Sequence, residues 1–168
     1  GGFFVMGYKI AIAADPFGFS LKNFIVKEME KKGHTFVDFC PDAPMEYSAA
    51  AHEVSKAVQN GSVDRGIAIC GTGMGVSIIC NKHRGVYAAL CENLWQAVRA
   101  KTVNNTNVLC LGGMITGEYL GAQMVDAWLD ADHLVGLDPE MADIVKGEFN
   151  RIPMLEEKLY KNDGRDVE

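Results

Sequence analysis

The sequence lacks any apolar run that could cross a bilayer, because its longest apolar stretches are strand-sized and a span needs roughly 20 residues. It also lacks a cluster of lysine and arginine, and 22 acidic residues against 16 basic ones leave a net charge of −6. We therefore expect no membrane and no nucleic-acid partner. Residues 1–5 have neither the charged region nor the long apolar stretch of a secretion signal. We interpret them as an added or unstructured leader before a natural start at Met6, in a cytoplasmic protein.

Paired cysteine motifs are missing as well. The chain has five cysteines, an odd number, with neither Cys-x-x-Cys nor the Cys/His spacing of zinc sites. They stand in apolar surroundings, which favours reduced, buried thiols over a disulfide scaffold. The acidic residues Asp42, Glu46 and Glu53 have no metal-site spacing either. We therefore expect no metal site.

The pattern that is present alternates short apolar runs with amphipathic helical segments. Continuously apolar strands separated by helices predict a parallel sheet covered on both faces. The sequence thus indicates an α/β fold: a Rossmann-like, three-layer αβα domain with a five-stranded parallel sheet of order 2-1-3-4-5. We place one domain over residues 6–168. The predicted strands are residues 9–14, 35–39, 66–70, 86–90 and 107–111.

The tail, residues 138–168, follows a different pattern. Asp138-Pro139 is a good cap and first-turn pair for a helix. An apolar stripe that includes Val145 and Phe149 follows, and we expect Pro153 to interrupt the helix. The stripe needs a surface to cover, either on a neighbouring subunit or on the flank of the domain itself.

Two turns of the predicted sheet are candidates for a ligand site. Ligands of open parallel sheets bind outside the carboxyl ends of the strands, near the point where the strand order reverses. This rule selects the turn after the first strand, which begins at Asp15, and the turn after the third, which begins at Cys70. Since these strands are neighbours, we expect Asp15 and Cys70 to face each other across one cleft.

The turn after the third strand contains Gly71, Gly73 and Gly75. Glycines at a strand-to-helix turn let backbone N–H groups approach a ligand oxygen, and the helix start adds partial positive charge. Both features stabilise an oxyanion such as an enediolate, and they favour the thiolate of Cys70. The turn could also hold a nucleotide phosphate. The chain has no Gly-x-Gly-x-x-Gly after its first strand, however, and no Gly-Lys-Ser/Thr.

The segment around this turn, IAICGTGMGVS at residues 67–77, continues to Asn81-Lys82. It closely resembles the signature of the ribose-5-phosphate isomerase B and galactose-6-phosphate isomerase family. Similar residues extend over roughly residues 8–130, among them Asp15, Asn104 and the VDAWL segment at 125–129. The resemblance implies a Rossmann-like domain, an obligate dimer, and aldose–ketose isomerisation through a cis-enediol with neither a metal nor a cofactor.

The resemblance also implies roles for individual residues. Cys70 corresponds to the base that moves a proton between C1 and C2 of the sugar, with Thr72 beside it. The amides of the glycine loop, residues 71–75, would hold the enediolate oxygen. The other expected substrate-binding residues are Asp15, Tyr47, Gly71, Gly73, Met74, Gly75, Asn81 and Asn104.

Four positions depart from the family pattern. Pro16, Val103, Met114 and Leu137 stand where the family has the histidines and arginines that open the sugar ring and bind its phosphate. Valine cannot transfer a proton, and methionine and leucine cannot bind a dianion. We therefore expect an open-chain substrate such as a tetrose phosphate or a deoxy-uronate, and not ribose 5-phosphate. The alternative is a catalytically reduced sugar-binding subunit of a heteromeric isomerase, but the retained Cys70 and glycine loop favour the enzyme.

The remaining polar candidates have simpler interpretations. We expect structural or solvated roles for the histidines, although His83 could replace the missing ring-opening residue. Trp95 and Trp128 are expected to pack. The other histidines are His34, His52 and His133. Four cations are available to bind a phosphate, and they could equally be solvated surface charges: Lys82, Arg84, Arg99 and Lys101.

Overall fold

The structure is a computed structural model that describes residues 7–161. The predicted leader, the start at Met6 and the end of the tail at 162–168 lie outside the described residues. Five strands and six helices alternate through the described part of the chain. The strands are β1 (Lys9–Ala14), β2 (Thr35–Asp38), β3 (Arg65–Cys70), β4 (Ala88–Leu90) and β5 (Val108–Gly112). The helices are α1 (Phe19–Glu30), α2 (Tyr47–Gln59), α3 (Met74–Cys80), α4 (Leu94–Thr102), α5 (Glu118–Asp130) and α6 (Pro139–Lys161).

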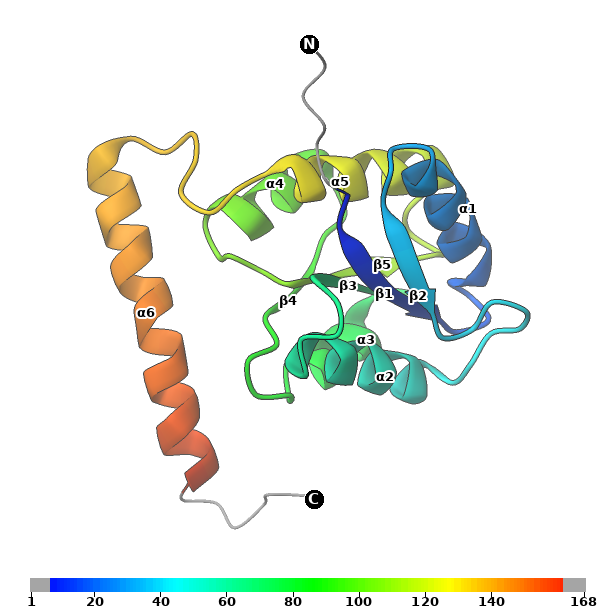
Figure 1. Ribbon diagram of the computed structural model, residues 1–168, viewed down its shortest axis with the longest axis horizontal. Helices are drawn as coiled ribbons and strands as arrows, with labels where there is room; N and C mark the ends of the chain where they lie inside the picture. Colours follow the sequence, from blue (N-terminus) through cyan, green and yellow to red (C-terminus); the bar gives the residue numbers. More distant parts are fainter. Residues whose placement is uncertain (1–6, 162–168) are drawn as a thin grey trace.

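The strands form one parallel sheet between two layers of helices, which confirms the predicted fold class. Helices α1, α4 and α5 cover one face of the sheet, and α2 and α3 cover the other (Figure 1). Along β1 the large side chains Ile10 and Ile12 point to the first face, and Ala11 and Ala13 point to the second. This alternation follows from the two-residue period of a strand, and it builds a separate core on each face.

The strand order is β2-β1-β3-β5-β4, so the predicted order 2-1-3-4-5 is wrong for the last two strands. All five residues of β5 are buried, which suits a position with a neighbour on each side. Strand β4 has three half-buried residues and pairs only with β5. The long apolar run at 86–90 thus yields a short edge strand. The strand order reverses between β1 and β3, as predicted.

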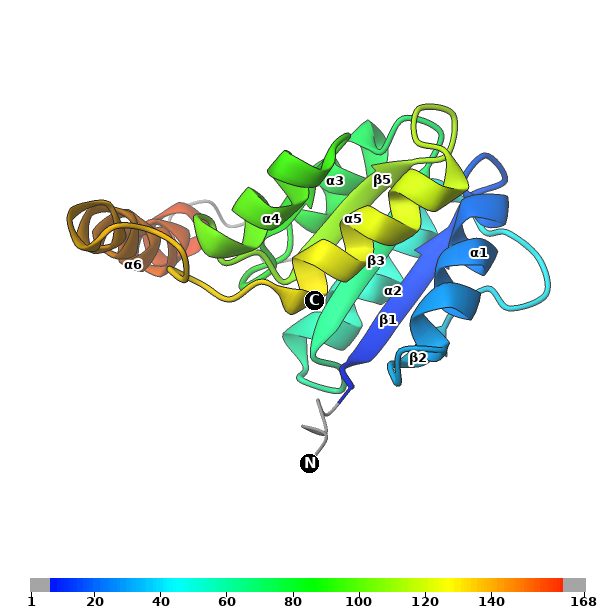
Figure 2. The same cartoon turned by 90° about the horizontal axis from the view of Figure 1, so that it is seen from above.

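Helix α6 lies at the β4 end of the molecule and projects away from the sandwich (Figure 2). Asp138 caps it as predicted, since its Oδ1 accepts the N–H of Met141 at 3.0 Å. The expected interruption at Pro153 is wrong: the helix runs through the proline to Lys161. A proline inside a helix removes one hydrogen bond and bends the axis without necessarily ending the helix.

Helix α6 contacts the flank of its own domain at a few points. The Glu156 carboxylate accepts hydrogen bonds from the N–H of Gly85 and the hydroxyl of Tyr87, both at 3.0 Å. The ring of Phe149 packs edge-on against Tyr87. Only Val145 of the helix is buried. Five large apolar side chains of α6 remain exposed, namely Met141, Ile144, Met154, Leu155 and Leu159.

Candidate functional site

The loops after β1, β3 and β5 meet at the carboxyl edge of the sheet. The N–H of Asp15 donates to the carbonyl of Ile69 at 3.1 Å, and the N–H of Gly113 donates to the carbonyl of Cys70 at 2.8 Å. The N–H of Met114 donates to the carbonyl of Gly71 at 2.9 Å. These bonds extend the sheet ladder into the loops, and they place Asp15 and Cys70 at the ends of the adjacent strands β1 and β3. The expected cleft between the two side chains stays a prediction.

Cys70 is the last residue of β3 and keeps 6% of its surface exposed. Its sulfur accepts a hydrogen bond from the backbone N–H of Gly73 at 3.2 Å. Such a bond stabilises a thiolate more than a neutral thiol. The sulfur thus lies just below the surface of the edge, with a donor directed at it.

The glycine loop has a conformation that other residues would not adopt. Gly73 has a φ of +76°, in the left-handed region. A Cβ on this residue would lie 2.4 Å from Cδ1 of Leu90 and 2.9 Å from the carbonyl carbon of Leu111. The loop therefore needs glycine here both for its dihedral angle and for its close approach to β5.

Two backbone donors of this loop make no hydrogen bond within the described part of the chain. Among residues 7–161, the N–H groups of Gly71 and Thr72 meet no hydrogen-bond acceptor. Gly71 is half-buried and Thr72 is exposed. The Thr72 hydroxyl oxygen lies 3.4 Å from the N–H of Met74 at the start of α3. Free N–H groups beside a cysteine sulfur can stabilise negative charge on a substrate oxygen.

Asp15 is 7% exposed and shapes the turn that leads into α1. Its Oδ1 accepts the N–H groups of Phe17 at 2.9 Å and Gly18 at 3.0 Å. A short acidic side chain that closes such a turn holds the following residues in place. The Asp15 carboxylate is thus a structural part of the edge next to Cys70.

Tyr47, Met74 and Gly75 also lie at this edge. Tyr47 begins α2, and its ring carbon Cε2 would lie 2.8 Å from a Cβ on Gly75. Gly75 therefore lets the tyrosine ring approach the first turn of α3. Met74 is 56% exposed beside it.

Phe17 lies in the turn that the ligand-site rule selects after the first strand, but the sequence does not single it out, and Met114 stands out only as a departure from the family pattern. Both lie against Gly71, where a Cβ would be 3.1 Å from the Met114 sulfur and 3.5 Å from the Phe17 Cβ. Both are more than 60% exposed. Their place at the ends of β1 and β5 could have been inferred from the ligand-site rule, but the adjacency of β3 and β5 was needed to bring Met114 to Gly71.

Asn81 and Asn104 are not brought to Cys70. Asn81 follows the last turn of α3, where its side chain donates to the carbonyl of Ala88 and accepts its N–H, both at 2.9 Å. Asn104 lies between α4 and β5, at the amino end of the sheet. It is exposed beside a groove of about 500 Å³ that α6 lines on the other side. Neither asparagine shares the edge of Cys70 within one chain.

The histidines lie outside this edge. His83 follows α3, and its Nε2 lies 2.8 Å from Nδ1 of His52 on α2. Nδ1 of His34 accepts the N–H of Tyr8 at 3.1 Å, and burial lowers the pKa of His34. Burial also lowers the pKa of His133, whose ring packs against Phe149 of α6. His34 and His133 are packed, whereas His52 is exposed, which agrees with the expected structural or solvated roles.

Three of the four candidate cations are engaged by neighbouring groups, and the fourth, Lys82, is exposed after α3. Arg84 stacks on Tyr160 of α6, with its Cζ 4.9 Å from the ring centre. Lys101 is 6% exposed, and burial lowers its pKa to about 8. Arg99 lies over the ring of Trp95 on α4. Helix α4 follows β4, which is separated from β3 by β5.

The other cysteines are buried and free, as expected. Burial raises the pKa of the Cys91 thiol to about 11 and also raises that of Cys40. Contact with the Cys80 thiol and burial raise the pKa of Cys110. Cys40, Cys91 and Cys110 are therefore neutral thiols at neutral pH.

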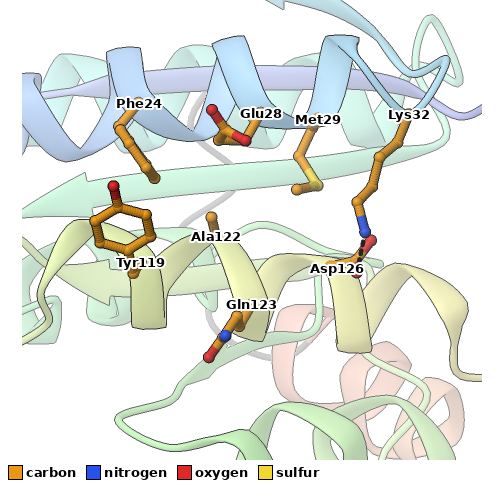
Figure 3. Close-up of a pocket in the computed structure, with 8 residues that line it drawn as sticks. All are labelled: Phe24, Glu28, Met29, Lys32, Tyr119, Ala122, Gln123 and Asp126. Atoms are coloured by element: carbon orange, nitrogen blue, oxygen red, sulfur yellow. Dashed lines mark hydrogen bonds and ion pairs between the residues drawn. The ribbon is translucent and has the colours of Figure 1, made fainter.

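A separate groove of about 150 Å³ lies between α1 and α5. Figure 3 shows Phe24 facing Tyr119 at one end and Lys32 reaching Asp126 at the other. Met29 and Ala122 lie between them. The groove lies in the layer of α1, α4 and α5, and it contains none of the predicted site residues.

The described residues contain neither a metal-binding cluster of three side chains nor a membrane-spanning helix. Across residues 7–161, no three His, Cys, Asp or Glu side chains are grouped so that they could hold a metal ion. Over the same range, none of the helices has the combined length and hydropathy of a membrane span.

The chain is similar to known sugar isomerases. Residues 10–140 match the family described as Ribose/Galactose Isomerase. The chain is 33% identical to 4-deoxy-4-sulfo-D-erythrose isomerase of Clostridium sp. (strain MSTE9) over 91% of this chain and 98% of that protein. It is 39% identical to D-erythrulose-4-phosphate isomerase of Pectobacterium atrosepticum over 73% of this chain and 83% of that protein.

Solved structures agree with these similarities. The crystal structure of ribose-5-phosphate isomerase B from Mycoplasma genitalium with bound ribulose-5-phosphate superposes with a TM-score of 0.80 at 32% identity. The match covers 91% of this chain and 99% of that one.

Proposed function

Because this chain belongs to the ribose/galactose isomerase family, we propose that it interconverts the aldose and ketose forms of a short open-chain sugar, with Cys70 as the base. The observation that carries the proposal is the hydrogen bond from Gly73 N–H to the Cys70 sulfur, beside the free N–H groups of Gly71 and Thr72. The Cys70 sulfur can hold a proton there, while the N–H groups of Gly71 and Thr72 bind a negatively charged oxygen.

The proposed reaction needs only a proton transfer. The Cys70 thiolate removes the proton from C2 of the aldose, and the electron pair moves through the new C1–C2 double bond onto the carbonyl oxygen. The N–H groups of Gly71 and Thr72 stabilise the resulting enediolate. The thiol then returns the proton to C1 as the O2 proton leaves to O1, which gives the ketose.

The proposed substrate is a four-carbon sugar with a terminal acidic group. Val103 stands at the position of the family's ring-opening histidine and cannot transfer a proton. A tetrose that lacks a free hydroxyl at C4 has no furanose ring to open. The names of two relatives, 4-deoxy-4-sulfo-D-erythrose isomerase and D-erythrulose-4-phosphate isomerase, support this size class and supply two candidate substrates.

Deuterium exchange tests the reaction. The protein and either candidate sugar in deuterated buffer should exchange the proton at C1 or C2, as followed by NMR. Cys70→Ala should lower this rate by about 10²–10⁴-fold, the range for loss of a general base. Cys91→Ala removes a different buried thiol, which follows β4, and should keep the rate. A protein that binds a sugar, as shown by a higher melting temperature, but exchanges no proton would be the sugar-binding subunit instead.

We also propose that two copies of the chain assemble in solution. Asn104 lies at the opposite edge of the sheet from Cys70, so it can contribute to a site only beside the Cys70 of a second copy. The exposed apolar side chains of α6 supply a surface for that copy. Leu155→Glu and Leu159→Glu should each yield monomers in sedimentation measurements, whereas Glu157→Lys on the same exposed helix should not. Five free cysteines support a reducing, cytoplasmic location.

A further inference from the structure

Two histidine side chains from different parts of the chain meet outside the Cys70 edge. His52 lies on α2, and His83 follows α3, 31 residues later in the sequence. Nδ1 of His52 lies 2.8 Å from Nε2 of His83, and the ring centres are 5.0 Å apart. Spacing along the sequence could not reveal this pair, because only the packing of the helices brings the two rings together.

The His83 ring is held in the orientation that is typical of metal-binding histidines. Its Nδ1 lies 2.9 Å from the carbonyl oxygen of Ile79. Since a carbonyl oxygen only accepts hydrogen bonds, Nδ1 carries the proton, and Nε2 of the neutral ring carries a lone pair. Histidines that bind metals usually donate their other ring N–H in this way, which fixes the tautomer. Nε2 of His83 is therefore prepared as a ligand on the side of His52.

The two elements that carry the rings are fixed against each other. Helices α2 and α3 cover the same face of the sheet (Figure 1). Ala51, the residue before His52, is fully buried, and its carbonyl oxygen accepts from the Cys80 thiol of α3 at 3.8 Å. His52 is exposed and His83 is half-buried, so an ion in water can reach both rings.

A transition-metal ion fits between the two nitrogens after a small movement. Two imidazole nitrogens that bind one tetrahedral zinc ion, each at about 2.0–2.1 Å, lie about 3.3 Å apart. The 2.8 Å between the rings is about 0.5 Å shorter than this, and rotation of the exposed His52 side chain can supply the difference. The proton between the two nitrogens then moves through water to Nε2 of His52.

We propose that His52 and His83 form a binding site for one divalent transition-metal ion of the kind that imidazole prefers, such as Zn²⁺ or Ni²⁺. Nδ1 of His52 and Nε2 of His83 are the protein ligands. Water fills the other positions, because within residues 7–161 no third His, Cys, Asp or Glu completes such a cluster. The adjacent carboxylate of Glu53 is paired with Lys56 at 2.9 Å. The site is thus open and exchangeable, and it does not depend on the proposed isomerisation at Cys70.

An ion at this place joins α2 to the segment on which α6 docks, residues 81–87. The Tyr160 hydroxyl of α6 donates to the carbonyl of Lys82 at 3.1 Å, directly before His83 in the sequence. Metal binding should therefore slow amide hydrogen exchange in this segment, as measured by mass spectrometry, because it opposes local opening. Unchanged exchange in the segment at saturating Zn²⁺ would contradict the assigned position of the ion and overturn the inference.

Calorimetric titration of the untagged, chelator-treated chain with zinc chloride tests the site directly. We expect one ion per chain. His52→Gln and His83→Gln each remove one ligand and should weaken binding at least about tenfold. Excess Mg²⁺ should not compete, since it prefers oxygen ligands. Absence of binding by the natural chain, or an unchanged affinity in His52→Gln, would overturn the inference.

Two control variants distinguish this site from other zinc ligands of the chain. Cys70→Ala removes the most exposed of the five thiols, and Glu53→Gln removes the carboxylate next to His52. Both variants should bind Zn²⁺ as tightly as the natural chain. Loss of binding in Cys70→Ala would place the ion at the glycine loop, and loss in Glu53→Gln would show a carboxylate ligand. Either result would overturn the two-histidine site.

Discussion

The backbone N–H of Gly73 donates a hydrogen bond to the sulfur of Cys70 over 3.2 Å. The same glycine has a φ of +76° and contacts the end of β5 closely. The donor is therefore fixed by two independent constraints, one on the backbone of the loop and one from the neighbouring strand. This arrangement prepares a place for negative charge on sulfur before any substrate binds.

Gly73→Ala should disrupt this arrangement. The left-handed backbone and the overlap with Leu90 and Leu111 together should cost about 2–4 kcal/mol of unfolding free energy. We expect deuterium exchange to fall at least about 100-fold. Gly61→Ala is the matched control, because Gly61 has a φ of +71° and open space around its Cα. It should cost about 1–2 kcal/mol and leave the activity intact. Equal losses of activity in both variants would argue against a specific role for Gly73.

Two substitutions of Asp15 should show whether its carboxylate only stabilises the turn or also binds the sugar. Asp15→Asn keeps an oxygen for the N–H groups of Phe17 and Gly18, so the unfolding free energy should change by less than about 1 kcal/mol. Asp15→Ala leaves both donors without their acceptor and should cost about 1–3 kcal/mol. Chemical denaturation measures both values. If the carboxylate contacts the sugar, Asp15→Asn should still raise KM about tenfold; an unchanged KM would restrict Asp15 to the turn.

Tyr87 should make the attachment of α6 sensitive to alkaline pH. Burial and the hydrogen bond to Glu156 raise the pKa of Tyr87 from 10 to about 12. The folded state therefore keeps a proton that the unfolded state loses between these values, so the stabilisation is complete below pH 10 and disappears as pH rises through about 12. The advantage of the natural protein over Tyr87→Phe, measured by denaturation, should fall by about 1 kcal/mol over that window. An advantage that grows with pH would contradict the assignment.

Lys101 should have the opposite pH dependence. Burial lowers its pKa from 10.5 to about 8. The unfolded state binds more protons between these values, so the natural protein should gain stability relative to Lys101→Met as pH rises from 8 to 10.5. The full shift corresponds to about 3 kcal/mol at most. Lys32→Met changes an exposed lysine and serves as the control. Parallel curves for Lys101→Met and Lys32→Met would mean that Lys101 is not desolvated.

Local patterns predicted most of the elements. The apolar run at 9–14 forms β1 with the expected bounds, and the run at 66–70 forms β3 with one added residue. Both strands are buried on two faces, so their sequences are almost uninterrupted apolar runs. The run at 86–90 was less informative, because a run of apolar residues does not distinguish an edge strand from a central one.

The candidate site could be predicted only in part. Cys70, the glycine loop and Asp15 were found because each directly follows a strand, and the carboxyl ends of parallel strands share one edge. Asn81 and Asn104 could not be placed by this rule, since each follows a helix. Their positions depend on where α3 and α4 end, and both of these ends lie away from Cys70.

The amino-acid sequence by itself determined the alternation of strands and helices, the position of the reversal between β1 and β3, and the thiol followed by a glycine loop. These features depend on side-chain periodicity and on backbone freedom, which act over a few residues. The tertiary structure decided that β5 lies between β3 and β4, and that Met114 and Phe17 lie against Gly71. Those outcomes depend on which distant segments pack together, and the free energy of that packing is not encoded in any one segment.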